Sequence, residues 1–265
     1  PGADAASSGA CEPWSMISPD PTSAPDVVIR ARGLLKQYGT TTALAGVDLD
    51  IPRGRSLAIM GASGSGKTTL LHCLAGIVVP DAGSVRLAGG DGSTADVAAT
   101  NDPQRTELRR TRFGFVFQQA MLIPELTAIE NLRFAAGLLG VRSGLSPTSA
   151  LAEVGLDGYA DVPIRQLSAG QRKRVALARV LLAPVGLWLL DEPYANLDLE
   201  GIRLVNRLLE NHANRGGSAL ITSHGAYAYT SGTPRRIPLR PGVGNRDPES
   251  ANLLPAGAEP RGAMR

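Results

Sequence analysis

Nine consecutive residues bring glycine, serine, lysine and threonine together at a spacing that suits phosphate binding. They are Gly61, Ala62, Ser63, Gly64, Ser65, Gly66, Lys67, Thr68 and Thr69, and they fit the pattern G-x-x-x-x-G-K-[ST]. Glycines let backbone N–H groups point at phosphate oxygens, while Lys67 and the start of a following helix add positive charge. The hydroxyl of Thr68 can ligate Mg²⁺.

The flanking residues distinguish this loop from a Gly/Ser turn that happens to precede a lysine. The apolar run from Leu57 to Met60 comes before it, and the helically spaced Leu70, Leu71 and Leu74 follow it. A strand, a glycine-rich loop and a helix in this order form the context in which the pattern binds phosphate. The sequence therefore predicts a phosphate-binding loop between a strand and a helix.

Two adjacent acids, Asp191 and Glu192, follow the apolar run Leu187–Leu190. Carboxylates at the exit of a buried strand cost free energy unless they find partners or carry out a function. Beside a phosphate loop, Asp191 can hold Mg²⁺ directly or through water, and Glu192 can polarise a water that attacks a γ-phosphate. The alternative is an ordinary strand end with two solvated acids, since Asp and Glu are mostly exposed.

A second anion site is predicted where Leu167-Ser168-Ala169-Gly170-Gln171 opens a helix. A serine hydroxyl and the unpaired N–H groups of a helix start can bind an anion. By itself the pentapeptide is also compatible with a plain N-cap.

The composition is that of a globular protein with room for a sizeable core. The chain has 265 residues, of which 43 per cent are hydrophobic, enough for one large α/β domain or two small ones. No apolar run reaches the roughly 18 residues of a membrane span. We expect no secretory signal, because the first residues lack a basic and an apolar segment. Cys11 and Cys73 suggest no metal or disulfide framework and suit a reducing cytosol.

The charge and the turn-forming residues divide the chain into three parts. Residues 1–26 predict a disordered head and residues 231–265 a disordered basic tail, which leaves residues 27–230 as the folded domain. Residues 1–225 carry 21 basic and 21 acidic side chains, so the net charge of +3 comes from the tail. We therefore expect no nucleic-acid surface on the folded domain.

Apolar runs and turn residues predict the elements that position these groups. Strands are expected over residues 27–32, 43–49, 57–60, 85–87, 113–117, 187–190 and 219–222. Helices are expected after the phosphate loop, over residues 128–139, from Ser146-Pro147 onward, and over residues 170–182.

The run LSAGQRKRVALARVLLAPVGLWLLDEP, together with the phosphate loop, resembles the ATP-binding cassette (ABC) ATPases. The resemblance extends from residue 27 to about residue 228. It implies an α/β fold with a RecA-like P-loop NTPase core, an antiparallel β subdomain and a helical insertion at about residues 119–166. It also implies an ATPase that uses ATP and Mg²⁺.

Further roles come from the same resemblance. It implies that Tyr38 stacks on adenine, although a surface tyrosine is the alternative there. Gln118, in FVFQQ, would touch Mg²⁺ and water, with Gln119 as its rival. The segment Ala195-Asn196-Leu197-Asp198 matches the family's D-loop, and His224 matches the switch histidine that contacts the γ-phosphate.

The resemblance also implies a head-to-tail dimer with a second ABC ATPase subunit. ATP would lie between the phosphate loop of one subunit and Ser168, Gly170 and Gln171 of the other. The implied catalytic residues are Lys67, Gln118, Glu192 and His224, and the implied Mg²⁺ ligands are Thr68, Gln118 and Asp191. Two residues depart from the usual family motifs: Ala169 stands where glycine is common, and Asn196 where a small apolar residue is.

At the level of subfamily the resemblance is mixed. Residues 40–123, with LAIMGASGSGKTTLLHCLAGI, resemble ATPases of lipoprotein-release and macrolide-export systems. From LTAIENLRFAAGLLGV onward, the chain resembles the haem-exporter ATPase of cytochrome c biogenesis. Both imply a separate transmembrane permease subunit and a peripheral position on the cytoplasmic face of the cell membrane. Haem export is the favoured interpretation, and lipoprotein or macrolide export is the alternative.

Other classes fit the sequence less well. A soluble ABC ATPase of translation usually carries two cassettes and one of DNA repair a long coiled coil, and this sequence has neither. A GTPase needs an N-K-x-D motif, and no Asn-Lys pair occurs in the chain. A catalytically inactive binding module is disfavoured because the residue types for catalysis are all present.

Overall fold

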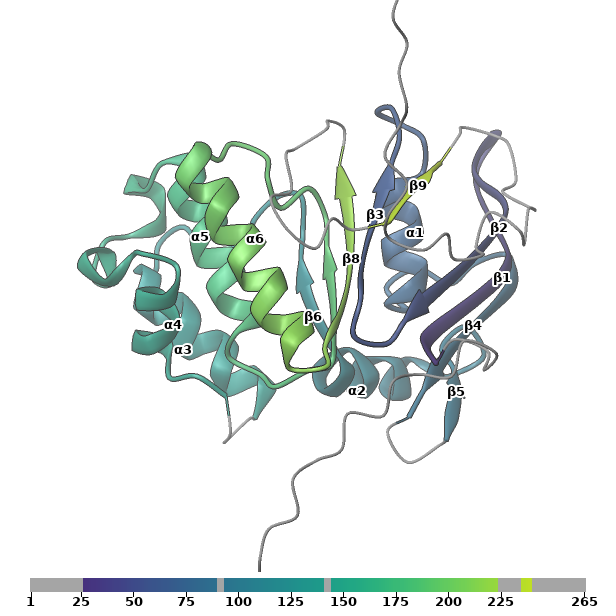
Figure 1. Ribbon diagram of the computed structural model, residues 1–265, viewed down its shortest axis with the longest axis horizontal. Helices are drawn as coiled ribbons and strands as arrows, with labels where there is room; N and C mark the ends of the chain where they lie inside the picture. Colours follow the sequence, from purple (N-terminus) through teal and green to yellow (C-terminus); the bar gives the residue numbers. More distant parts are fainter. Residues whose placement is uncertain (1–25, 90–92, 141–143, 224–234, 240–265) are drawn as a thin grey trace, which may run out of the picture.

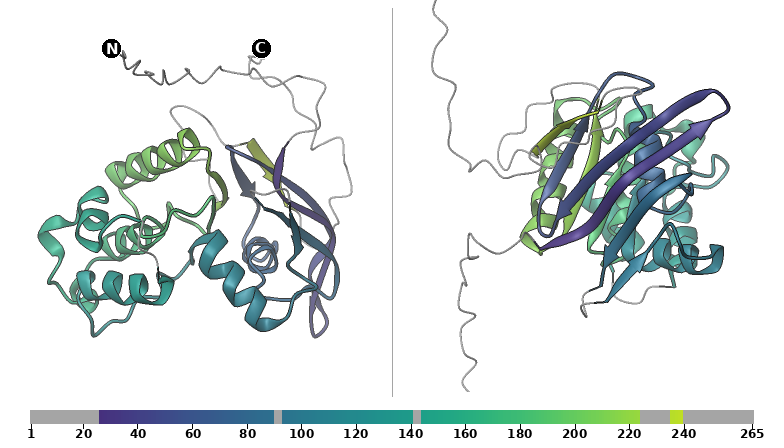
Figure 2. Two further views of the ribbon diagram at one scale, coloured as in Figure 1. Left: turned by 90° about the horizontal axis from the view of Figure 1, so that it is seen from below. Right: turned by 90° about the vertical axis from the view of Figure 1, so that its right-hand side faces the viewer.

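The computed structural model describes residues 26–89, 93–140, 144–223 and 235–239, which fold into two sheets with helices around them (Figure 1). One sheet is antiparallel, in the strand order β2-β1-β4-β5, and the other is parallel, in the order β6-β7-β8-β3-β9. The helices α3, α4 and α5 lie on the opposite side of the parallel sheet from the antiparallel one (Figure 2). The predicted core, β subdomain and helical insertion are therefore all present.

The antiparallel sheet covers one side of the helix that follows the phosphate loop. Its strands are β1 (Val27–Tyr38), β2 (Thr41–Pro52), β4 (Ala82–Ala88) and β5 (Thr94–Asp96). Helix α1 (Lys67–Leu74) lies between the two sheets (Figure 2), where Leu70 and Leu71 pack in one apolar cluster with Ile29 and Leu34 of β1. This packing fixes α1, and with it the loop that precedes α1.

The parallel sheet brings the predicted chemistry to one edge. Its strands are β3 (Ser56–Met60), β6 (Phe113–Val116), β7 (Leu187–Leu190), β8 (Ser218–Ser223) and β9 (Arg235–Pro238). Every residue of β7 and β8 is buried, as expected for parallel strands covered on both faces. Because parallel strands share a direction, the residues after β3, β6 and β7 all emerge at the same edge.

The helical insertion forms as predicted, and its helices begin at capping residues. It contains α3 (Ala128–Leu139), α4 (Pro147–Glu153) and the short 3-10 helices η1 (Asp157–Tyr159) and η2 (Ile164–Gln166), and α5 (Ala169–Val180) follows it. Thr127 and Glu130 form a capping box at α3, and Ser146 caps α4, which satisfies backbone N–H groups that a helix start leaves unpaired.

Two helices are absent from the sequence-based expectations. Helix α2 (Asp102–Arg112) buries none of its residues, so it has no apolar stripe that would indicate a helix. Helix α6 (Leu199–Asn214) does have one, since Leu204, Val205 and Leu208 are buried on one side. Within the described ranges, no helix combines the length and the apolar character needed to cross a bilayer.

The predicted end of the folded domain at residue 230 is too early. Strand β9 (Arg235–Pro238) lies within the predicted disordered tail and pairs with β3 in parallel register, from Leu57–Arg235 to Met60–Pro238. Leu239 is buried, and its N–H donates to the Met60 carbonyl over 2.8 Å. The glycine and proline content of the tail predicted disorder, and the strand was therefore not expected. Strand β9 supplies hydrogen-bond partners to the outer side of β3. The predicted head lies, apart from residue 26, outside the described residues.

Candidate nucleotide-binding site

The phosphate loop connects β3 to α1, as the sequence predicts. Gly66 caps α1 with φ of 92°, a left-handed conformation that favours glycine. A Cβ at Gly66 would lie 2.3 Å from the Ala43 carbonyl oxygen, and one at Gly61 would lie 2.7 Å from the Leu239 carbonyl oxygen. Both glycines are therefore required by close packing of the loop on the neighbouring backbone.

The other loop residues divide into an outer and an inner group. Ala62, Ser63 and Gly64 are exposed, Thr68 and Thr69 are half-buried, and Ser65 is buried. The Ser65 hydroxyl has no hydrogen-bond partner among the described residues. An unpaired buried hydroxyl in a glycine-rich loop fits a site built to receive an acceptor such as a phosphate oxygen.

Lys67 is held against the loop and is 5 % exposed. Its Nζ donates to the carbonyl oxygens of Gly61 and Ala62, over 2.8 Å in each case. Burial lowers the pKa of Lys67, and the nearby carboxyls of Glu192 and Asp191 oppose that shift. A cation in this position faces both the loop and the two acids.

Asp191 joins the phosphate loop to the end of β7. Its Oδ2 accepts a hydrogen bond of 2.8 Å from the Thr68 hydroxyl, which is 123 residues away in the sequence. Its Oδ1 accepts from the Thr222 hydroxyl of β8, and its backbone N–H donates to the Val116 carbonyl of β6 over 2.8 Å. Asp191 is 1 % exposed, so these contacts fix its carboxyl at the junction of three strands and the loop.

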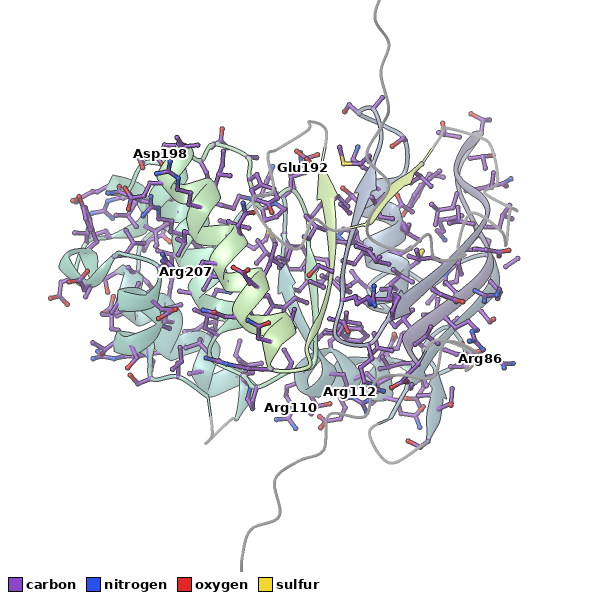
Figure 3. All side chains as sticks on the ribbon, in the orientation of Figure 1. Arg86, Arg110, Arg112, Glu192, Asp198 and Arg207 are labelled. Atoms are coloured by element: carbon purple, nitrogen blue, oxygen red, sulfur yellow. The ribbon has the colours of Figure 1, made fainter. Side chains whose placement is uncertain are left out.

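Glu192 lies at the edge of the parallel sheet toward which the arrowhead of β8 points (Figure 3). Its φ is 49°, a strained value for a non-glycine residue, and residues with such strain cluster at functional sites. The Glu192 N–H donates to the Thr222 hydroxyl over 3.0 Å. That bond holds the backbone in the conformation that presents the half-buried Glu192 side chain at the site.

Thr222 is the residue at this site that the sequence analysis missed. Its hydroxyl accepts from the Glu192 N–H and donates to the Asp191 carboxyl, while the residue is fully buried. The sequence contains a signal for this role, because Thr222, a residue with a hydroxyl group, directly follows the apolar run Ala219–Ile221 of a strand that is expected to be buried. A buried polar side chain in such a strand needs a partner.

The predicted second anion site is an exposed helix start. Ser168 caps α5, and its hydroxyl accepts a 3.1 Å hydrogen bond from the Gln171 N–H. The Gln171 side chain accepts in turn from the Ser168 N–H over 2.8 Å. A Cβ at Gly170 would lie 2.9 Å from the carbonyl oxygen of Asn196. Gly170 therefore packs directly on the segment that resembles the D-loop, whereas Ala169 is exposed and its methyl is accommodated.

The remaining predicted residues are solvent-facing or undescribed. Gln118 and its rival Gln119 are both exposed just after β6, so burial alone does not choose between them. Tyr38 is 50 % exposed at the end of β1, and Lys36 Nζ lies 5.6 Å from its ring centroid. His224 lies outside the described residues, one position beyond the end of β8.

The fold and the site define an ATP-binding cassette. The sequence profile of the ABC transporter family matches residues 44–195, and the chain belongs to that family. Members of the family bind and hydrolyse ATP, so this chain is an ABC ATPase.

Curated relatives and solved structures agree with this assignment. The cytochrome c biogenesis ATP-binding export protein CcmA of Xanthomonas campestris pv. campestris is 46% identical over 225 residues, which are 84% of this chain and 98% of the relative. The protein of the same name from Methylococcus capsulatus is 42% identical over 76% of this chain and 93% of its own length. A dimeric structure of the ATP-binding cassette MJ0796, in a post-hydrolysis state bound to ADP and Pi, has a TM-score of 0.70 and 30% identity, covering 81% of this chain and 95% of that one.

Proposed function

We propose that this chain is the ATP-hydrolysing subunit of an export transporter that serves cytochrome c biogenesis, with haem as its cargo. The 46% identity to a cytochrome c biogenesis export protein supports the pathway. The 2.8 Å hydrogen bond between Thr68 and Asp191 supports the chemistry, because it joins the phosphate loop to the acid pair at a single site.

Each residue of this site has a distinct role in the proposal. The loop N–H groups and Lys67 hold the β- and γ-phosphates, and Tyr38 stacks on the adenine. Glu192 accepts the proton of the water that attacks the γ-phosphorus, as the leaving oxygen of ADP takes up the electrons of the broken P–O bond. Gln118 orients the water, and His224 stabilises charge on the γ-phosphate.

The donor set at Asp191 fits Mg²⁺. A hydroxyl and a carboxylate, held 2.8 Å apart by Thr68 and Asp191, are hard oxygen ligands of the kind that this ion prefers in phosphate sites. Gln118 adds an amide oxygen from the loop after β6. Bound Mg²⁺ would neutralise negative charge on the phosphate oxygens. Loss of turnover in EDTA and its recovery with added Mg²⁺ would support this part of the proposal.

The nucleotide is proposed to be shared in a head-to-tail dimer. Ser168, Gly170 and Gln171 lie at the start of helix α5, where Ser168 is exposed, and the positive end of a helix can receive a γ-phosphate from another subunit. The solved dimeric cassette of 30% identity supports such pairing.

Mixing two inactive variants tests the shared site. A Lys67→Ala chain lacks the loop cation, and a Ser168→Arg chain has its helix start blocked. In a mixed dimer, the intact loop of the second chain meets the intact helix start of the first, so at most one complete site forms. We expect each variant alone to be inactive and the mixture to regain a fraction of the wild-type ATPase rate. If the mixture shows only the averaged rates of the two separate variants, the nucleotide is not shared.

The membrane partner is proposed to be a separate permease on whose cytoplasmic side this chain docks. Exposed apolar side chains of α3, Phe134 at 52 % and Leu138 at 66 % exposure, suit contact with an amphipathic segment. Co-purification with the permease of a haem exporter and with that of a lipoprotein or macrolide exporter tests the choice. Retention by the haem-export permease alone is expected, and retention by the other type alone would reverse the assignment.

A further inference from the structure

Lys173 is a buried cation between α5 and the loop after β6. It is 3 % exposed, and its Nζ donates to the Gln118 carbonyl oxygen over 2.9 Å and approaches the Phe117 carbonyl oxygen at 3.4 Å. Lys173 belongs to the same helix that begins after Ser168. One side chain therefore connects this helix to the backbone of the Gln118 loop.

A lysine in this environment is costly unless it serves a purpose. Removing an ammonium group from water costs free energy, and an apolar side chain of similar length in the same buried position would not carry that cost. Burial lowers the pKa of Lys173, and the carboxyls of Asp191 and Glu192 act in the opposite direction. The cation thus lies within electrostatic reach of the acid pair as well as in contact with the loop.

We propose that Lys173 is a positioning residue that fixes the Gln118 loop to helix α5, so that the loop and the helix start at Ser168 move as one unit. The inference rests on the proposed function, in which Gln118 faces the ATP of its own subunit and Ser168 faces the ATP of the other. Through Lys173, closure of one site on its nucleotide is transmitted to the loop that serves the second site.

Arg179 offers a matched comparison on the same helix. Its Nη1 donates to the carbonyl oxygens of Met121, over 2.8 Å, and Ala120, over 3.2 Å. It therefore ties α5 to the same loop farther from Gln118, and burial is the cause that lowers its pKa. A general loosening of the loop should follow from either substitution, whereas misplacement of Gln118 should follow from loss of Lys173 alone.

The test uses the full chain with the substitutions Lys173→Met, Lys173→Arg and Arg179→Met. For Lys173→Met we expect about a tenfold fall in kcat with KM for ATP changed less than about twofold, because binding is retained and positioning is lost. Amide hydrogen exchange over residues 117–119 should quicken about tenfold. Lys173→Arg, which keeps a cationic donor, should restore most of the kcat. Arg179→Met should keep kcat within about threefold.

Hydrogen exchange separates this inference from the proposed function, because it is read on the protein without turnover. If the wild type does not hydrolyse ATP but Lys173 still slows hydrogen exchange over residues 117–119, the proposed function is refuted. The connection between the Gln118 loop and helix α5 then still stands. Unchanged exchange and kcat in Lys173→Met would overturn the inference, as would equal losses of kcat in Lys173→Met and Arg179→Met. If Lys173→Met does not fold, Lys173→Gln, which also removes the cation, replaces it in the test. The same changes in hydrogen exchange and kcat are then expected, and the same results would overturn the inference.

Discussion

Replacement of Thr222 by valine should disable the acid pair while leaving the shape of β8 almost unchanged. The hydroxyl of the fully buried Thr222 bridges the Asp191 carboxyl and the Glu192 N–H. Valine keeps the branched shape and removes the bridge. The buried Asp191 carboxyl and the N–H of the half-buried Glu192 then each lose a hydrogen-bond partner.

The magnitude follows from these two contacts. A hydrogen bond to a charged group contributes about 1.5–3 kcal/mol, and a buried N–H left without a partner costs about 1–3 kcal/mol. We therefore expect the free energy of unfolding to fall by about 3–5 kcal/mol in Thr222→Val. At about 2–4 °C per kcal/mol for a chain of this size, the Tm should fall by roughly 6–20 °C. The kcat for ATP should fall at least about tenfold, because the Glu192 backbone is no longer held.

Thr222→Ser is the matched control, since it keeps the hydroxyl and removes one methyl group, for a cost of about 1 kcal/mol. Urea unfolding of both variants, followed by fluorescence of the buried Trp188, measures the difference. The serine variant should be the more stable by about 2–4 kcal/mol and should keep most of its ATPase activity. A valine variant as stable and as active as the serine variant would refute the proposed bridge.

Two further predictions concern packing and pH. Gly170→Ala places a methyl 2.9 Å from the Asn196 carbonyl oxygen, so it should lower ATPase activity about fivefold, whereas Ala169→Gly at the exposed neighbouring position should keep it within about twofold. His212 stacks on Trp188 with ring centroids 3.8 Å apart, and burial lowers its pKa from 6.5 to about 4. The neutral ring therefore contributes stability above pH 6.5 that is lost as the pH falls toward 4, by up to about 3 kcal/mol. In acid titrations of unfolding, His212→Phe should lack this loss between pH 6.5 and 4, and an identical profile would contradict the assignment.

The sequence predicted the parts of the site that lie in continuous motifs. The loop from Gly61 to Thr69 and the strand before Asp191 have local patterns, and parallel pairing of both β3 and β7 with β8 brings them together. The pattern did not reveal the contacts between distant segments. Thr222 and Lys173 act through hydrogen bonds to residues far from them in the sequence, and no periodicity marks such partners.

The fold shows the same division between local and distant signals. Helix α3 was predicted with its observed bounds from its apolar spacing, which is a local signal, and the capping box of Thr127 and Glu130 at its start is local as well. Strand β9 was missed because four residues between glycine- and proline-rich stretches carry little pattern of their own, and their pairing with β3 decides their structure.

ATP binding and hydrolysis by Glu192→Gln test the central claim most directly. The substitution keeps the size of the side chain and removes its capacity to accept a proton. We expect wild-type affinity for ATP and a turnover number reduced by on the order of 10²-fold or more, as for loss of a positioned base. Glu153→Gln, at an exposed position of α4, should match the wild type in both measurements. Turnover by Glu192→Gln at the wild-type rate would contradict the assignment of Glu192 and with it the proposed mechanism of ATP hydrolysis.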